Sequence, residues 1–328
     1  MFPHRARRGP LGHAAVVSVV LLGVMAAGSV YVTARAHDPG ELVSSSASPG
    51  TTAAMEATVE SATAPLSTTG PAPATTPVSV SVSASASPVD RDADALLAEA
   101  VGSVPVEAGA RVSVAVLDTE SGRSAVYGDG AFDTASIVKA DILASLLLQA
   151  QDAGRGLTAQ EKTYAAAMIR DSDNASATAL WKAIGQAQGL AAANKRFGLG
   201  DTQGGDGLLW GLTQTTAADQ LTLLRQVFGN DSELDADSRQ YLRGLMRDIA
   251  AGQDWGVSAA GPSGFALKNG WLPRSATGLW DINSVGRVKA GGREYLVAVL
   301  SDGNSTKAKG ISLVETAAKA AVSVLAKN

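Results

Sequence analysis

The chain has 328 residues, no cysteine, three histidines and a formal net charge of −4. The histidines are His4, His13 and His37, so everything after residue 37 lacks both His and Cys. This excludes Ser-His-Asp triads, cysteine nucleophiles and metal sites built on His or Cys ligands, and we expect no metal and no cofactor. The mild acidity, without a basic stretch that carries aromatic residues, argues against nucleic-acid binding. A hydrolase of this composition must take its base from a lysine or a carboxylate.

The N-terminal segment is basic and then apolar. Three arginines before residue 9 precede a mostly apolar, uncharged run over 14–33, which is about long enough to span a bilayer core. Ala34-Arg35-Ala36 resembles a signal-peptidase site, so we expect 1–36 to be either a cleaved signal peptide or a membrane anchor. Both interpretations predict an exported protein of the cell envelope, membrane-anchored or secreted.

A linker is predicted over 37–88, which is rich in Ser, Thr, Ala and Pro and has no aromatic residue. Such a segment cannot bury enough apolar surface to offset its conformational entropy, so we expect a disordered tether. The remaining 89–328 has the length of one folded domain, and it contains no internal repeat.

The folded part starts with a helix over 90–101, a strand over Arg111–Asp118 and its hairpin partner over 123–127. A buried helix opens near Ser136, and further helices are predicted over 159–170, 175–184, 216–227 and 237–250. Period-two patterns then predict strands over 264–269, 279–288 and 294–300, with turns at 270–273 and 290–292 and a closing helix over 312–326. This order predicts an α+β fold: an antiparallel five-stranded sheet flanked by terminal helices, with an all-helical lobe inserted between the second and third strands.

Ser136 and Lys139 open the buried helix and are one turn apart on the same face. The positive field of a helix N-terminus stabilises an alkoxide or oxyanion at the serine and disfavours the ammonium form of the lysine. This pattern indicates acyl transfer through a serine nucleophile, with lysine in place of histidine as the base. A capped helix with a solvated lysine is the structural alternative. The apolar run over 140–148 argues against it, because this lysine could not easily reach bulk water.

Three short motifs occur in a fixed order along the chain: Ser136-Ile137-Val138-Lys139, Ser172-Asp173-Asn174 and Lys268-Asn269-Gly270. Together they resemble the Ser-x-x-Lys, Ser-Asp-Asn and Lys-Thr-Gly motifs of serine β-lactamases and penicillin-binding proteins, most closely the class A β-lactamase-like serine hydrolases. The likeness covers about 106–325. The third motif departs from the family pattern, because Asn269 replaces the threonine.

The resemblance implies a role for each matching residue. Ser136 would attack the substrate carbonyl and carry the acyl group, and Lys139 would be a base for that step. Ser172, with Lys268 beside it, would relay a proton to the leaving nitrogen. Asn174 would hydrogen-bond either the substrate amide or Lys139.

The substrate side of the site is implied by residues on and after the third motif. Backbone N–H groups of Ser136 and Trp271 would form the oxyanion hole, and Gly270 would let the substrate approach the strand. Asn269 would lie near a substrate carboxylate, which Arg274, or alternatively Arg287, would anchor. The structural alternatives are that Ser-Asp-Asn is a helix cap and Lys-Asn-Gly a turn. Four tryptophans are expected to be packing residues, Trp271 also holding a site position: Trp210, Trp255, Trp271 and Trp280.

The family's deacylating glutamate has no counterpart in the corresponding stretch, 198–214. Its acids are Asp201 and Asp206, and Asp206 lies nearer the expected place, where it is either a deacylation base or part of a solvated turn. We therefore expect a monomeric envelope serine hydrolase that forms an acyl-enzyme with a small-molecule β-lactam or a D-alanyl peptide or ester of peptidoglycan, and that deacylates slowly. The alternatives are an efficient class A-type β-lactamase using Asp206 and a non-catalytic module that senses peptidoglycan or antibiotic.

Overall fold

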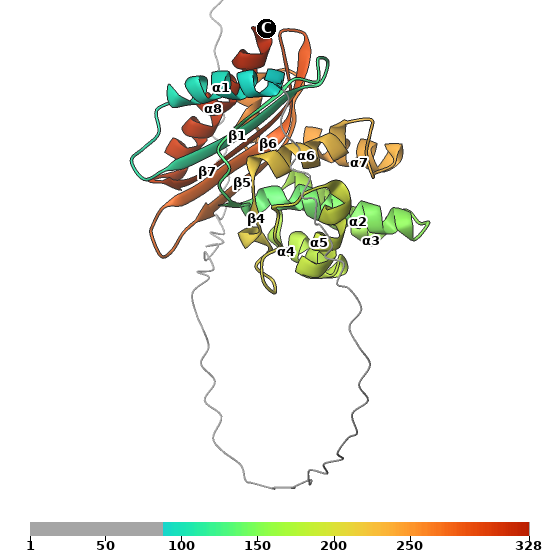
Figure 1. The fold of residues 1–328 in the computed structure, drawn as a ribbon. Coiled ribbons are helices and arrows are strands. Elements are labelled where there is room, and N and C mark those ends of the chain that lie inside the picture. Colours follow the sequence, from blue (N-terminus) through green and yellow to red (C-terminus); the bar gives the residue numbers. More distant parts are fainter. Residues whose placement is uncertain (1–87, 328) are drawn as a thin grey trace, which may run out of the picture. The chain divides into compact units, whose positions relative to one another are not determined.

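The computed structural model describes residues 88–327, which form one folded unit (Figure 1). Its centre is a five-stranded antiparallel sheet in the order β2-β1-β7-β6-β5. The strands are β1 (Arg111–Asp118), β2 (Ser124–Tyr127), β5 (Ala266–Pro273), β6 (Trp280–Ala290) and β7 (Arg293–Asn304). Two short strands, β3 (Phe132–Asp133) and β4 (Gln214–Thr215), pair with each other.

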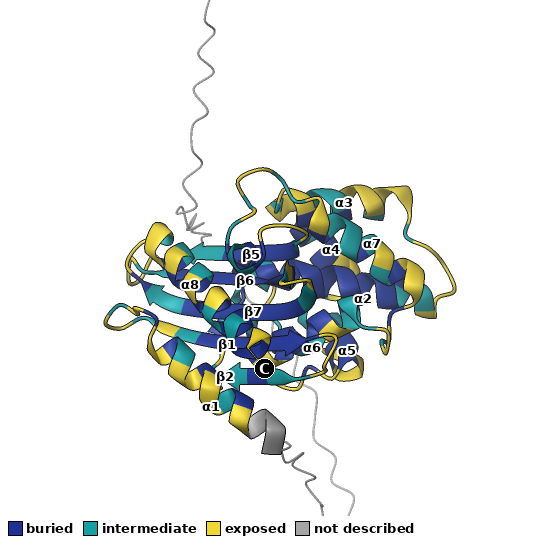
Figure 2. Cartoon of the chain, turned by 90° about the horizontal axis from the view of Figure 1, so that it is seen from above, coloured by how far each residue is buried: buried dark blue, intermediate teal, exposed yellow. Residues whose placement is uncertain are grey.

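Helices cover both faces of the sheet. The terminal helices α1 (Pro88–Gly102) and α8 (Lys307–Ala326) lie together on one face (Figures 1 and 2). The helical lobe lies against the other face. Its helices are α2 (Val138–Asp152), α3 (Ala159–Arg170), α4 (Asn174–Ala183), α5 (Gln186–Phe197), α6 (Ala217–Phe228) and α7 (Ala236–Arg247). Residues 88–327 also contain three short 3-10 helices: η1 (Ala135–Ile137), η2 (Trp210–Leu212) and η3 (Val257–Ala260).

The alternation of side chains along the strands explains this three-layer arrangement. In β1, Val114 and Val116 pack into the core beneath α1 and α8, whereas Ala115 and Leu117 pack into the core shared with the helical lobe. The central strands are buried along most of their length (Figure 2). Each fully buried Val or Leu side chain contributes about 1.5–3 kcal/mol to folding, so both faces of the sheet need their helical cover.

The predicted α+β architecture is confirmed, with the helical lobe between the second and third strands of the main sheet. The strand at 111–118 and the helix at 159–170 have the predicted bounds. Thr216 caps α6 by accepting a hydrogen bond from the backbone N–H of Asp219 at 3.1 Å.

The sequence prediction omits one helix and misplaces one turn. Helix α5 was not predicted, and it begins directly after Gly185, whose φ of 92° separates it from α4. The turn predicted at 270–273 is part of β5, which continues to Pro273 because Gly270 to Pro273 pair in register with β6. Proline is tolerated there because β5 is an edge strand. The connection to β6 lies at 274–279 instead.

The predicted leader over 1–36 lies outside the described residues, as does the linker over 37–88 up to its last residue. The division into these segments and a domain over 89–328 therefore stays a prediction. Within residues 88–327, every helix is too short or too polar to cross a bilayer.

Candidate active site

Ser136 lies in η1, immediately before α2, and is half-buried. The preceding segment is fixed by Asn283 of β6, whose side-chain amide donates to the carbonyl oxygens of Asp133 at 2.8 Å and Thr134 at 3.0 Å. Ala135 has a φ of 47°, in the left-handed region that non-glycine residues seldom adopt. The surrounding sheet therefore imposes a strained backbone on the residue before the candidate nucleophile, as is common at functional sites.

The edge strand β5 runs directly past the backbone of Ser136. A Cβ atom on Gly270 would lie 2.7 Å from the Thr134 oxygen and 2.8 Å from the Ser136 nitrogen, which is closer than van der Waals contact permits. Only glycine fits here. The structure thus brings the N–H of Ser136 next to Gly270, the neighbour of Trp271.

Two buried lysines meet at the hydroxyl of Ser172, between α3 and α4. Lys139 donates to the Ser172 hydroxyl at 3.1 Å, to its carbonyl oxygen at 2.7 Å and to the Asn174 side-chain oxygen at 2.8 Å. Lys268 donates to the same hydroxyl at 3.1 Å and to the backbone carbonyl oxygen of Asn269 at 2.9 Å. Ser172, like Ala135, has a left-handed backbone, with φ 56°. Residues from all three predicted motifs therefore lie together.

Burial lowers the pKa of both lysines. It lowers the pKa of Lys139 to about 7, while the carboxylate of Asp173 acts in the opposite direction. Burial also lowers the pKa of Lys268 well below its usual value, and the charge of Lys139 lowers it further. A lysine that titrates near neutral pH can serve as a base, which an ordinary surface lysine cannot.

The second motif combines a structural and a chemical role. Asp173 caps α4 by accepting a hydrogen bond from the Ser176 N–H at 2.6 Å, as the capping interpretation expects. Ser172 and Asn174, on either side of it, point to Lys139. Capping thus fixes the backbone that presents the two polar side chains.

Trp210 is a site residue that the sequence did not identify as such. Its ring faces the ammonium group of Lys139, with 4.8 Å between the nitrogen and the ring centroid. The indole N–H donates to the Thr178 hydroxyl at 3.1 Å, which fixes the ring orientation. A tryptophan face attracts a cation and excludes water from it.

Asp206 lies in the same loop but is exposed at a turn. Its backbone oxygen accepts from the Leu209 N–H at 2.9 Å, and no hydrogen bond or ion pair of its carboxylate is found within residues 88–327. The turn interpretation fits this position. Trp210, not Asp206, is the loop residue that contacts Lys139.

The side chain of Asn269 points away from the lysine–serine site. It is buried, and its amide donates to the carbonyl oxygens of Gln253 at 2.8 Å and Trp255 at 2.9 Å. The reason is strand alternation, because Asn269 points to the opposite face of β5 from Lys268 and Gly270. The expected contact of Asn269 with a substrate carboxylate is therefore corrected: this side chain holds the segment before η3.

The two candidate carboxylate anchors are both engaged with acids. Arg274 forms ion pairs with Asp133 and, at 3.4 Å, with Asp281. Arg287 stacks on Phe228 and lies 3.6 Å from Glu294. Arg274 can therefore bind a substrate only if it leaves Asp133 and Asp281. Arg287 lies beside the end of α6.

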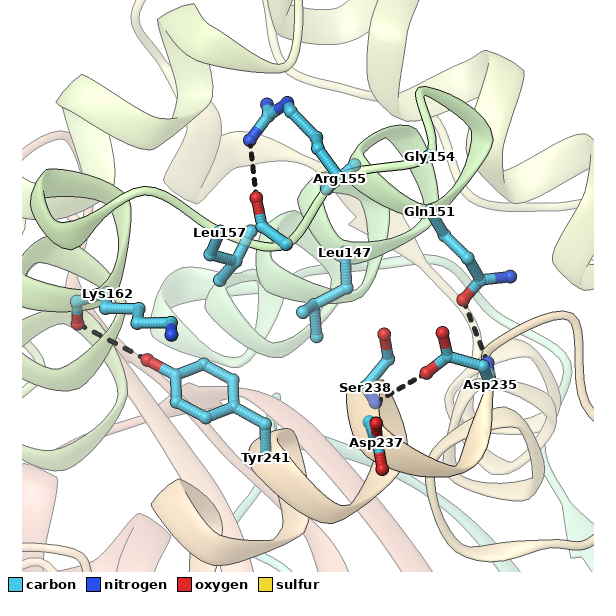
Figure 3. A pocket seen from close by; sticks show the side chains of 12 residues that line it. Leu147, Gln151, Gly154, Arg155, Leu157, Lys162, Asp235, Asp237, Ser238 and Tyr241 are labelled. Atoms are coloured by element: carbon cyan, nitrogen blue, oxygen red, sulfur yellow. Dashed lines mark hydrogen bonds between the residues drawn. The ribbon is translucent and has the colours of Figure 1, made fainter.

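A separate hollow of about 560 Å³ lies at the other end of α2 (Figure 3). Leu147, Lys162 and Tyr241 line it, and the Tyr241 hydroxyl donates to the Lys162 carbonyl oxygen at 3.3 Å. Leu147 follows Ser136 by eleven positions, roughly 16 Å along a helix axis. This hollow is therefore not part of the lysine–serine site. In the part of the chain that the structure describes, no three His, Cys, Asp or Glu side chains group as metal ligands would.

A serine–lysine site between an antiparallel sheet and a helical lobe defines the serine hydrolases that include β-lactamases and penicillin-binding proteins. The family model described as the beta-lactamase enzyme family (Beta-lactamase2) matches residues 148–325. The chain belongs to this family and is a serine hydrolase. The matched region includes Ser172, Asn174 and Lys268, and it begins after Ser136 and Lys139.

Solved structures share the fold. A PBP-A variant in an acyl-enzyme complex with penicillin G is 21% identical, with a TM-score of 0.61 over 71% of this chain and 97% of that chain. A class A β-lactamase from Bacteroides cellulosilyticus is 17% identical, with a TM-score of 0.61 over 73% and 99% of the two chains. The extended-spectrum β-lactamase TLA-1 is 15% identical, with a TM-score of 0.62 over 72% and 99%. The comparison with curated proteins gave no match.

Proposed function

We propose that this serine hydrolase forms an acyl-enzyme at Ser136 with a β-lactam or a D-alanyl peptide or ester, and that it deacylates slowly. The observation that carries the proposal is the Ser172 hydroxyl, which accepts hydrogen bonds from both Lys139 and Lys268 at 3.1 Å. Such a group can pass a proton between an attacking serine and a leaving nitrogen or oxygen.

In the proposed acylation, neutral Lys139 takes the proton of the Ser136 hydroxyl while the serine oxygen bonds to the substrate carbonyl carbon. The carbonyl oxygen becomes negative and is held by the N–H groups of Ser136 and Trp271. When the carbon–nitrogen or carbon–oxygen bond breaks, the leaving atom takes a proton from the Ser172 hydroxyl. The Lys139 ammonium then returns a proton to Ser172. Lys268 donates a hydrogen bond to the oxygen of Ser172 throughout.

Slow deacylation is supported by the surroundings of Lys139. Hydrolysis of the acyl-enzyme needs a base that activates water. The loop over 198–214 presents the apolar face of Trp210 to Lys139, and its acid Asp206 lies in an exposed turn. The PBP-A variant in complex with penicillin G is described as an acyl-enzyme. We infer that the same state accumulates here.

We place this activity in the cell envelope, on the sequence of residues 1–36, as either a membrane-anchored or a secreted enzyme. The substrate would then be a cell-wall peptide or an antibiotic that reaches the same compartment.

Intact-protein mass spectrometry of the full chain, followed over time with a penicillin, tests the proposal. We expect a long-lived adduct that is absent in Ser136→Ala, and the same adduct lifetime in Asp206→Asn. A short-lived adduct with accumulating product, lengthened in Asp206→Asn, would instead identify an efficient β-lactamase that uses Asp206. A folded protein without an adduct, whose ligand affinity survives Ser136→Ala, would identify a binding module.

A further inference from the structure

A buried carboxyl group lies on the side of α2 that faces away from the lysine–serine site. Asp141 follows Lys139 by two positions, which is about 200° around a helix. Its side chain is 1% exposed. It faces α5 and α6. Helix α2 thus points Lys139 toward the lysine–serine site and Asp141 toward the interior of the helical lobe.

The contacts of Asp141 do not suit a carboxylate. The amide nitrogen of Asn194 on α5 donates to one carboxyl oxygen at 3.1 Å. The other carboxyl oxygen has no partner, and neither has the Asn194 side-chain oxygen or the hydroxyl of Ser145, which lies one turn along α2. The charged group that acts on Asp141 from α6 is another acid, Asp219, and none of the arginines or lysines of residues 88–327 pairs with Asp141. A buried negative charge with one donor and a like charge nearby is strongly unfavourable.

A proton on Asp141 removes this mismatch. The unpaired carboxyl oxygen becomes a hydroxyl donor, and the amide that already donates to Asp141 supplies an unpaired acceptor, the Asn194 oxygen. The acid and the amide can then exchange two hydrogen bonds, one in each direction. Burial raises the pKa of Asp141 to about 7, and the negative charge of Asp219 raises it further. The Asn194 amide opposes the shift, and the nearby Ser145 hydroxyl does so more weakly, because it lies outside hydrogen-bond geometry.

The acid on α6 also anchors the loop that carries Trp210. Asp219 accepts hydrogen bonds from the Asp201 N–H at 2.8 Å and from the Thr202 hydroxyl at 2.7 Å. An ionised Asp141 would therefore place a second negative charge beside the group that holds the start of this loop.

We propose that Asp141 is held as a neutral carboxylic acid whose pair with Asn194 fixes α2, and with it Lys139, against α5. Asp141 is in this sense a positioning residue for the acylation of Ser136. The positioning role rests on the proposed function, whereas the protonation state does not.

The test compares the full chain with Asp141→Asn, and with Asp237→Asn as a matched control at an exposed acid on α7. Asparagine keeps one donor and one acceptor for Asn194 and carries no charge. Because the pKa of Asp141 is raised in the folded state, its stabilising effect is complete at low pH and is lost as the pH rises to about 7. From about pH 5 to 7, the unfolding constant of the wild type relative to Asp141→Asn should rise by up to about tenfold per pH unit, and then level off. Asp237→Asn should show no such trend.

A ratio that does not change with pH, or that falls as the pH rises, overturns the neutral acid. If Asp141→Asn does not fold, Asp141→Leu replaces it, because the same pH trend must appear whatever its absolute stability. The positioning role is read from penicillin acylation rates, whose ratio of Asp141→Asn to wild type should increase above about pH 7. A constant ratio overturns that role. Absence of acylation in every protein would contradict the proposed function and leave the unfolding result intact.

Discussion

Lys139 and Lys268 donate to one hydroxyl group, that of Ser172, each at 3.1 Å. Two ammonium groups so close to each other disfavour each other's charge, and burial acts in the same direction on both. Both effects favour the loss of a proton from this pair of lysines. Protons come off such a pair in steps that belong to the pair, and this is the property that a proton relay requires.

Acylation of Ser136 should slow down in acid. Burial lowers the pKa of Lys139 to about 7, and only the neutral amine can take the serine proton. Below that pH the acylation rate is expected to fall by about tenfold per pH unit. The rate of adduct formation with a penicillin between about pH 5 and 9 checks this. A flat profile would mean that Lys139 is not the base.

Trp210→Ala should move that profile to higher pH. Burial is the main cause of the lowered pKa of Lys139, and removal of the ring lets water reach the ammonium group. We expect the midpoint to rise by about one pH unit. Trp210→Phe is the matched control, since it keeps a ring over the amine and should keep the midpoint. A midpoint that falls in Trp210→Ala would show that attraction to the ring, and not exclusion of water, is the larger effect.

Gly270→Ala should reduce acylation by about 100-fold or more, because the added methyl group would push β5 away from the backbone of Ser136. Gly244→Ala provides the comparison. Gly244 lies inside α7, where an added methyl group meets no atom within 4 Å. The Gly244→Ala variant should gain up to about 1 kcal/mol in the free energy of unfolding and keep its acylation rate. Equal acylation rates in the two variants would refute the close approach of β5 to Ser136.

Asn269→Leu should act on stability before it acts on chemistry. The substitution removes two hydrogen bonds and leaves the carbonyl oxygens of Gln253 and Trp255 without their donor. A loss of about 1–3 kcal/mol in the free energy of unfolding is expected, measured by urea denaturation. Unchanged stability together with weaker penicillin binding would restore the earlier prediction that Asn269 contacts the substrate.

The sequence was sufficient for the architecture because most elements are locally consistent. Alternating valines predict β1, and a threonine cap predicts the start of α6. Helix α5 was not predicted because Gly185 and Gly189 resemble helix breakers. The structure explains Gly189 by packing, since a Cβ there would lie 1.6 Å from the carbonyl oxygen of Ile184. Such a requirement depends on the path of the preceding turn, which the sequence does not reveal.

The site could be predicted where a motif fixes the geometry. Ser172 and Asn174 flank a cap, so their direction follows from the start of α4. The orientation of Asn269 was also available, because strand alternation places it opposite Lys268. The contact of Trp210 with Lys139 was not, since it depends on how the loop over 198–214 returns across α4.

The pairing of β1 with β7 sets the order in which this chain can fold. These two central strands come from opposite ends of the folded unit, with Val114 opposite Val299. The helices between them make more local contacts and can form early, whereas the sheet must wait until β7 has been synthesised. A nascent chain therefore leaves one edge of β1 unpaired until β7 arrives. If the chain is exported, as we propose, the sheet closes only after β7 has crossed the membrane.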